Sequence, residues 1–186
     1  MSLYRVTDAL ERAPVIAATD RRNWKTALTS EAEVLFHLNL DLLTAKEALT
    51  AAKQQDKLVF VHIDLAEGIG KDKTGLAWLA QLGADGIIST RSHLIKAAKE
   101  LGLCTVQRFF ALDSKGLDSI RDTMETCRPD LAEIMPGVIP KVVARFVGTG
   151  VPVIAGGLIE TKAEVTAALG QGALAVSTGK SELWSL

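Results

Sequence analysis

The sequence is poor in cysteine, in aromatic residues and in long hydrophobic runs. Its two cysteines, Cys104 and Cys127, lack metal-site spacing, and we expect both to be reduced thiols in a cytoplasmic protein. No apolar run approaches the roughly 20 residues that cross a membrane, and no signal-peptide pattern opens the chain. A P-loop, a dinucleotide glycine fingerprint and a strong metal-ligand set are also missing. The sequence therefore predicts no membrane partner, no metal and no cofactor.

The sequence also lacks an excess of positive or negative charge, since 21 basic and 22 acidic side chains give a formal net charge of −1. This balance argues against a strongly basic, non-specific nucleic-acid binder, whereas RNA held by a local patch stays open. Hydrophobic residues make up 48% of the chain, which is typical of a parallel sheet covered by helices. A chain of 186 residues is long enough for one domain with a sizeable core.

Short apolar runs alternate with amphipathic stretches along the chain. The runs expected to be strands are 14–18, 34–38, 58–63, 86–89, 103–108, 131–135, 151–155 and 173–177. The expected helices are 41–54, 72–82, 92–101, 114–127, 141–147 and 161–169. The alternation predicts a compact single-domain α/β fold over 1–186, a (β/α)₈ TIM-type barrel with parallel strands, with an open doubly wound sheet as the alternative. The weakly patterned residues 1–12 form a lead-in segment in this interpretation.

Two helix starts carry residues suited to capping. Ser114 is expected to cap the helix that runs to about Cys127. Thr161 is followed three residues later by Glu164, which is the pattern of a capping box.

Two turns at the ends of the last strands are suited to holding a phosphate. Their residues are Gly156, Gly157 and Leu158 after the seventh strand, and Ser177, Thr178 and Gly179 after the eighth. Glycines let the backbone amides approach an anion closely, and many barrels bind phosphate after these two strands. Ordinary glycine-containing turns are the plainer alternative for each turn alone, but their joint occurrence in this order favours a phosphate site.

Polar side chains at other strand ends are suited to a small polyol at the barrel mouth. The candidates are His62, Asp64, Ser89, Arg108 and Glu133. His62 and Asp64 lie two apart and share a face if Val61 and Ile63 pack against the helices. Glu133 interrupts an apolar strand, where a carboxylate needs a ligand or a cation such as Arg108.

The strand ends offer little for covalent catalysis. No lysine lies where desolvation would favour a Schiff-base amine, because Lys180 follows the last strand in a polar turn. His37 and Asn39 end the second strand, and the pattern leaves open whether either faces inward. We therefore expect no catalytic residue, although His62 and Asp64 keep a phosphosugar isomerase, epimerase or aldolase as the alternative.

Longer stretches resemble one family closely. They are VFVHIDLAEGIG (59–70), ADGIISTRSHLIKAAKELGL (84–103), VQRFFALDS (106–114), EIMPGVIPKV (133–142), PVIAGGLIETKAEV (152–165) and ALAVST (173–178). Together they resemble the glycerol-3-phosphate-responsive antiterminators of bacterial glycerol uptake operons, from about Pro14 to Trp184. The resemblance implies a non-catalytic barrel that binds glycerol 3-phosphate and then acts on leader mRNA, preventing a terminator from stopping transcription.

The resemblance also assigns roles to residues. It implies that Gly156, Gly157, Ser177 and Thr178 hold the phosphate, and that His62, Asp64, Arg108 and Glu133 surround the glycerol part. An RNA surface has no recognised motif, so its candidates are three cationic groups: Arg21, Arg22 and Lys25; Lys71 and Lys73; and Lys141 with Arg145. A homodimer is a further possibility, with ligand coupling through residues 67–73 or through dimerisation.

Overall fold

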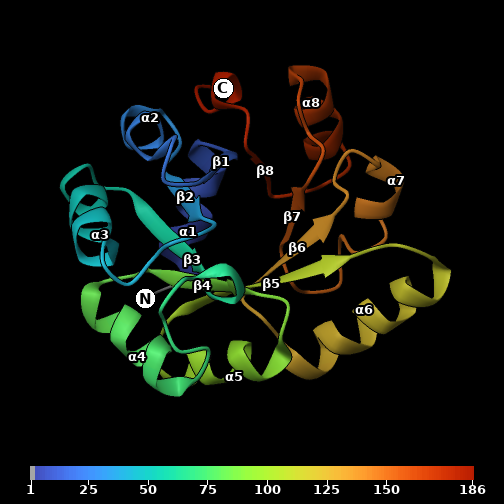
Figure 1. The fold of residues 1–186 in the computed structure, drawn as a ribbon. Coiled ribbons are helices and arrows are strands. Elements are labelled where there is room, and N and C mark those ends of the chain that lie inside the picture. Colours follow the sequence, from blue (N-terminus) through green and yellow to red (C-terminus); the bar gives the residue numbers. More distant parts are fainter. Residues whose placement is uncertain (1–2) are drawn as a thin grey trace.

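The computed structural model describes residues 3–186 and shows a closed barrel of eight parallel strands. The strands follow one another in chain order, and β8 (Ala175–Thr178) pairs with β1 (Val15–Thr19) to close the ring. Helices surround the strands, as Figure 1 shows. This arrangement confirms the predicted (β/α)₈ barrel and excludes the open sheet, which would leave two strand edges unpaired.

The remaining elements alternate along the chain. The strands are β2 (Val34–His37), β3 (Leu58–His62), β4 (Gly86–Ser89), β5 (Cys104–Phe110), β6 (Leu131–Met135) and β7 (Val153–Gly156). The helices are α1 (Leu3–Arg12), α2 (Trp24–Thr29), α3 (Ala45–Gln54), α4 (Lys73–Leu82), α5 (Ser92–Glu100), α6 (Ser114–Cys127), α7 (Pro140–Val143) and α8 (Lys162–Gly170). Two short 3₁₀ helices, η1 (Ile63–Leu65) and η2 (Ser181–Leu183), follow β3 and β8.

Side chains of each strand alternate between two hydrophobic cores. On β3, Phe60 packs inside the barrel, whereas Val61 packs in the layer between strands and helices, together with Ile63 of η1. The prediction that His62 and Asp64 share a face required Val61 and Ile63 to pack against the helices. This packing of Val61 and Ile63 is confirmed. The same alternation on β6 places Glu133 two residues beyond the inward-facing Leu131, inside the barrel.

The helix α1 closes the end of the barrel where the strands begin. Its fully buried Val6, Ala9 and Leu10 pack with Val34 and Leu58, the first residues of β2 and β3. Residues 3–12 of the expected lead-in segment are thus a helix that the sequence analysis did not predict. The i, i+3, i+4 spacing of its apolar residues was the available signal.

Three of the early expectations concern what the fold contains besides the barrel. Both cysteines are buried free thiols, and burial raises the pKa of Cys104 to about 12. No helix between residues 3 and 186 combines the length and apolar character needed to cross a membrane. Over the same residues, His, Cys, Asp and Glu side chains form no group of three suited to a metal ion.

Candidate functional site

A cavity of about 180 Å³ opens at the carboxyl ends of the strands. Seven of the predicted site residues line it: Arg108, Glu133, Gly157, Leu158, Ser177, Thr178 and Gly179. Four apolar residues that the sequence pattern did not indicate complete the lining: Ala18, Leu38, Met135 and Ile159. We call this space the mouth cavity, and its position is where barrels of this class bind ligands.

Glu133 anchors the floor of the mouth cavity. Its fully buried carboxylate accepts hydrogen bonds from Arg108 Nε at 2.5 Å and from the Ser177 hydroxyl at 2.5 Å. Arg108 stands beside it on β5, but Ser177 is two strands away, because Gly156 of β7 lies between. A β-carbon at Gly156 would lie 2.4 Å from Glu133 Oε1, so the glycine lets the carboxylate reach across the strand. The suspected Arg108–Glu133 salt bridge is therefore present.

The phosphate turns offer backbone donors to the mouth cavity. Among the contacts of residues 3–186, the N–H groups of Gly157, Leu158 and Gly179 donate no hydrogen bond to protein. Gly157 and Leu158 have φ angles of +81° and +60°, a left-handed conformation that is unusual for leucine. The two turns thus leave three unbonded amides in residues that line the same cavity as Arg108.

Thr178 lines the mouth cavity, but its hydroxyl is hydrogen-bonded within the protein. Its hydroxyl donates to the carbonyl of Ile159 at 2.7 Å and accepts from the Lys180 amide at 3.1 Å. The Trp184 indole donates to the Thr178 carbonyl at 2.8 Å. The side chain therefore ties the two turns together, and its hydroxyl proton is already used.

Asp64 and Ser89 form a second polar cluster, at the ends of β3 and β4. The Asp64 carboxylate accepts from the Ser89 hydroxyl at 2.9 Å and from the Thr90 amide at 2.7 Å, and Arg91 lies 3.5 Å away. Burial acts to raise the pKa of Asp64, but the hydrogen bonds from Thr90 and Ser89 hold it below its ordinary value. Neither Asp64 nor Ser89 lines the mouth cavity, so the structure does not bring them together with the phosphate turns.

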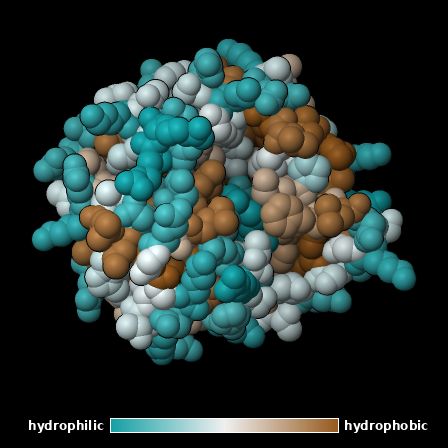
Figure 2. Space-filling model, viewed as in Figure 1, coloured by the Kyte–Doolittle hydropathy of each residue, from teal (hydrophilic) through white to brown (hydrophobic). Residues whose placement is uncertain are grey.

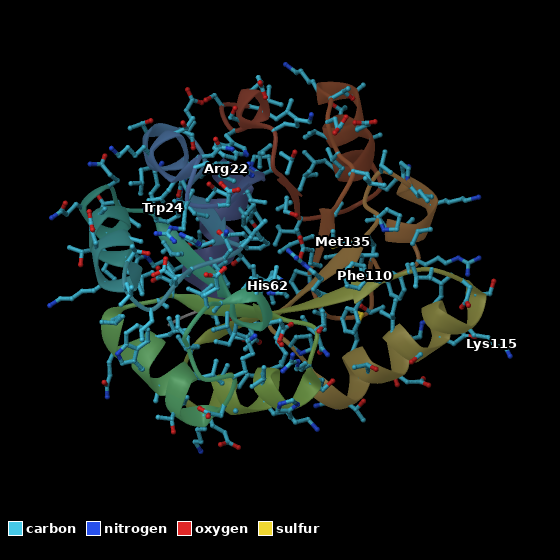
Figure 3. All side chains as sticks on the ribbon, in the orientation of Figure 1. Arg22, Trp24, His62, Phe110, Lys115 and Met135 are labelled. Atoms are coloured by element: carbon cyan, nitrogen blue, oxygen red, sulfur yellow. The ribbon has the colours of Figure 1, made fainter. Side chains whose placement is uncertain are left out.

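His62 lies between the two clusters, on the inner face of β3. Burial and the Arg108 charge lower its pKa to about 4, against the smaller opposing effects of Asp64 and Glu133. The residue is 3% exposed and does not line the mouth cavity, and its Nδ1 has no hydrogen-bond partner among the described residues. The imidazole is therefore neutral at pH 7 and has an unused nitrogen. Figure 3 shows His62 near the centre of the barrel mouth.

The buried histidines make stability depend on pH. His37 resembles His62 in having a pKa lowered to about 4, chiefly by burial. Between pH 6.5 and 4 the unfolded chain binds protons that the folded chain does not, so stability falls as the pH falls through this window. We expect a loss of roughly 3 kcal/mol for each histidine, measured by urea unfolding at a series of pH values. His62→Asn and His37→Asn should each flatten the profile, and a flat wild-type profile from pH 6.5 to 5 would contradict this.

His37 itself does not face the mouth. Its ring packs on Trp24, with ring centroids 4.8 Å apart, outside the barrel. The following residue, Leu38, faces the mouth cavity instead. The sequence left open whether His37 faces inward. The alternation of side chains along β2 directs His37 outward and Leu38 inward.

Exposed apolar side chains stand at the strand ends and on the segments that follow the strands around the mouth. They are Leu42, Leu43, Leu65, Phe110, Leu112 and Leu158. Figure 2 shows hydrophobic groups on both sides of a hydrophilic centre on this face. The polar floor of the site is thus surrounded by an apolar rim, which is typical of small-molecule sites.

Comparison with known proteins relates this geometry to one family. Residues 15–184 match the family described as glycerol-3-phosphate responsive antiterminator. The crystal structure of the glycerol uptake operon antiterminator regulatory protein of Listeria monocytogenes is 32% identical, with a TM-score of 0.85, over 91% of this chain and 94% of that one. An antiterminator-related protein of Thermotoga maritima is 35% identical, with a TM-score of 0.82, over 91% of this chain and 96% of that one.

A curated relative also covers most of the chain. The uncharacterized protein YgcP of Escherichia coli K12 is 33% identical over 95% of this chain and 94% of its own length. Aldolases and an epimerase share the barrel at 12–15% identity, which shows a common fold alone. The matched residues include every strand of the barrel and both turns of the mouth cavity, so the chain belongs to the glycerol-3-phosphate responsive antiterminator family.

Proposed function

We propose that the mouth cavity binds glycerol 3-phosphate and that the liganded protein acts on leader mRNA as a transcription antiterminator in the cytoplasm. The observation that carries the ligand assignment is the set of three unbonded amides, of Gly157, Leu158 and Gly179, beside one arginine. Backbone amides and a guanidinium are donors, and a phosphate presents only acceptors. Membership of the family supports the antitermination role.

The ends of the cavity suit the two ends of the ligand. The phosphate would meet the three amides and the amino groups of Arg108, whose Nε is held by Glu133. The glycerol hydroxyls would lie toward the floor, where Glu133 has acceptor oxygens. His62 lies behind this lining, and its unused Nδ1 would reach a hydroxyl by turning toward the cavity. A neutral imidazole both donates and accepts hydrogen bonds, as a hydroxyl does. Asp64 and Ser89 would support this end by fixing the loops after β3 and β4.

A titration of leader RNA with and without glycerol 3-phosphate tests the proposal. We expect at least about tenfold tighter RNA binding with the ligand, because coupling between two sites is typically worth 5–150-fold. Repeating the titration at two salt concentrations should give weaker binding at high salt, since phosphate contacts release counterions. Sedimentation in the same buffers shows whether the ligand also changes dimerisation. Equal RNA affinity in both ligand states would contradict the regulatory role.

A phosphosugar isomerase, epimerase or aldolase is the second candidate, because barrels of those enzymes share this fold. It would need an acid or base beside the reacting carbon. Glu133 lines the mouth cavity, and His62 lies close to Glu133. Among residues 3–186, no lysine lines the mouth cavity, and Lys180 is paired with Glu160 at 3.2 Å. Turnover of a triose or pentose phosphate, with no effect of ligand on RNA binding, would favour the enzyme.

A further inference from the structure

A second cavity, of about 240 Å³, lies outside the barrel between α2 and α3. Trp24 and His37 line it together with the apolar Leu28, Ala48 and Ala51. Figure 3 shows Trp24 between the ribbons of these two helices. None of these residues lines the mouth cavity, so this space, here called the α2–α3 cavity, is separate from the proposed glycerol 3-phosphate site.

Two ring nitrogens in this cavity lack partners. Trp24 Nε1 and His37 Nδ1 make no hydrogen bond among the described residues, although their side chains belong to residues only 9% and 2% exposed. The two rings contact each other at an interplanar angle of 47°. Buried polar atoms are nearly always hydrogen-bonded, so two unpartnered atoms in residues that line one cavity favour a ligand that supplies the partners.

The rim of the α2–α3 cavity carries both signs of charge. Arg21 lines it and is paired with Asp41 at 2.9 Å, whereas Lys25 takes part in no ion pair within residues 3–186. Glu47 of α3 also lines the cavity and opposes an anion. Next to the cavity, Arg22 is held by Asp20 at 2.6 Å. Lys25 is therefore the unpaired cation available to a negative group at the cavity entrance.

We propose that the α2–α3 cavity binds the base of a nucleotide, with the phosphate at Lys25 and Arg21. A nucleobase is flat, so its faces can contact Leu28, Ala48 and Ala51. Its edge offers partners to Trp24 Nε1 and His37 Nδ1 once a rotation of the two rings brings these buried atoms to the cavity wall. An inorganic anion would leave the apolar walls uncovered, and a hydrocarbon would leave both ring nitrogens unbonded. The source of the nucleotide is an unpaired residue of RNA, a choice that rests on the proposed function.

The position of the α2–α3 cavity links it to the mouth cavity. His37 faces the outer cavity, and the next residue along β2, Leu38, lines the mouth. On the neighbouring β1, Thr19 is in register with His37, and Ala18 lines the mouth. A ligand that moves the ends of β1 and β2 would alter both cavities, so the two sites can affect each other's affinity.

Short single-stranded RNA oligonucleotides and free nucleoside monophosphates are the probes. Quenching of tryptophan fluorescence reports their binding, and Trp24→Phe identifies the signal of Trp24 because it keeps a ring but removes the N–H. Ala51→Leu fills the cavity, and Thr50→Leu places the same side chain on an exposed neighbouring position. We expect Ala51→Leu to weaken RNA binding at least about tenfold, the range found for loss of one stacked base, with Thr50→Leu within about twofold of wild type.

Lys25→Ala should weaken RNA binding and reduce its salt dependence, with the exposed Lys46→Ala, which does not line the cavity, as the matched control. Calorimetry with glycerol 3-phosphate and thermal melts on the same variants show whether the mouth cavity and the fold are intact. If the Ala51→Leu variant bound leader RNA with the affinity of the wild type, the cavity assignment would be overturned, but the proposed function would stand. Binding of monophosphates alone would support the nucleotide site with a free ligand as its source, and an effect on oligomeric state alone would overturn it.

Discussion

Replacing Glu133 with alanine should lower the free energy of unfolding by about 3–5 kcal/mol, one of the largest effects expected of any single change in the barrel. The carboxylate is fully buried and accepts hydrogen bonds from Arg108 and Ser177. Its removal leaves a guanidinium that is only 10% exposed without its counter-charge, and leaves the buried hydroxyl without its acceptor. Urea denaturation followed by circular dichroism measures the loss.

Two companion variants separate the charge from the packing. Glu133→Gln keeps the shape and one acceptor oxygen, and should still be destabilised because Arg108 remains unpaired. The double variant Glu133→Leu, Arg108→Met removes both charges and should recover much of the stability, since buried pairs are often replaceable by apolar groups. It should not bind glycerol 3-phosphate, because the cation is gone. An alanine variant as stable as wild type would contradict the role of the pair.

The barrel was predictable because its signals are local and repeated. Apolar runs ending in polar turns mark strands, and the eight units leave little choice of topology. The predicted strand bounds agree closely with the observed ones. For example, the range 58–63 was predicted, and β3 runs over Leu58–His62. The Thr161 capping box is confirmed, with Glu164 bonding back to the chain. These features depend on residues close together in sequence, where spacing alone carries the information.

Long-range contacts were harder to predict. The bond from Ser177 to Glu133 crosses β7 and requires Gly156 to have no side chain, a relation that no single strand reveals. Position 156 therefore has a steric reason for glycine that the sequence reading, which considered only backbone amides, did not contain. The hydroxyl of Thr178 is suited to phosphate by type, but its bond to Ile159 depends on how two turns meet.

Some local predictions were wrong because neighbours compete. The residue that caps α6 is Asp113, whose carboxylate accepts from the Gly116 amide, and the predicted cap Ser114 is the first residue of the helix. Both residue types are good caps, so the sequence pattern alone could not rank them. The α1 helix was missed for a different reason: its stability comes from the open barrel end that it covers, and this end exists only in the folded protein.

Replacing Gly157 with aspartate should weaken binding of glycerol 3-phosphate at least about a hundredfold while leaving the fold intact. The new carboxylate would stand at the proposed phosphate turn, where two unit charges 4 Å apart repel by about 4 kcal/mol at an effective dielectric constant of 20. A β-carbon at this position would meet the flexible end of Met135 at 2.6 Å, which can move aside. The φ of +81° is one that aspartate tolerates better than most residues.

Gly157→Asn is the matched control, because asparagine has the same size and tolerates the same backbone conformation but carries no charge. It should lose far less affinity than the aspartate variant, and the difference between the two isolates the repulsion of the phosphate from the steric effect of a side chain. Calorimetric titration gives both affinities, and melting curves confirm that both variants fold. Equal losses in the two variants would assign the effect to shape, and unchanged affinity in both would place the phosphate away from the turns after β7 and β8.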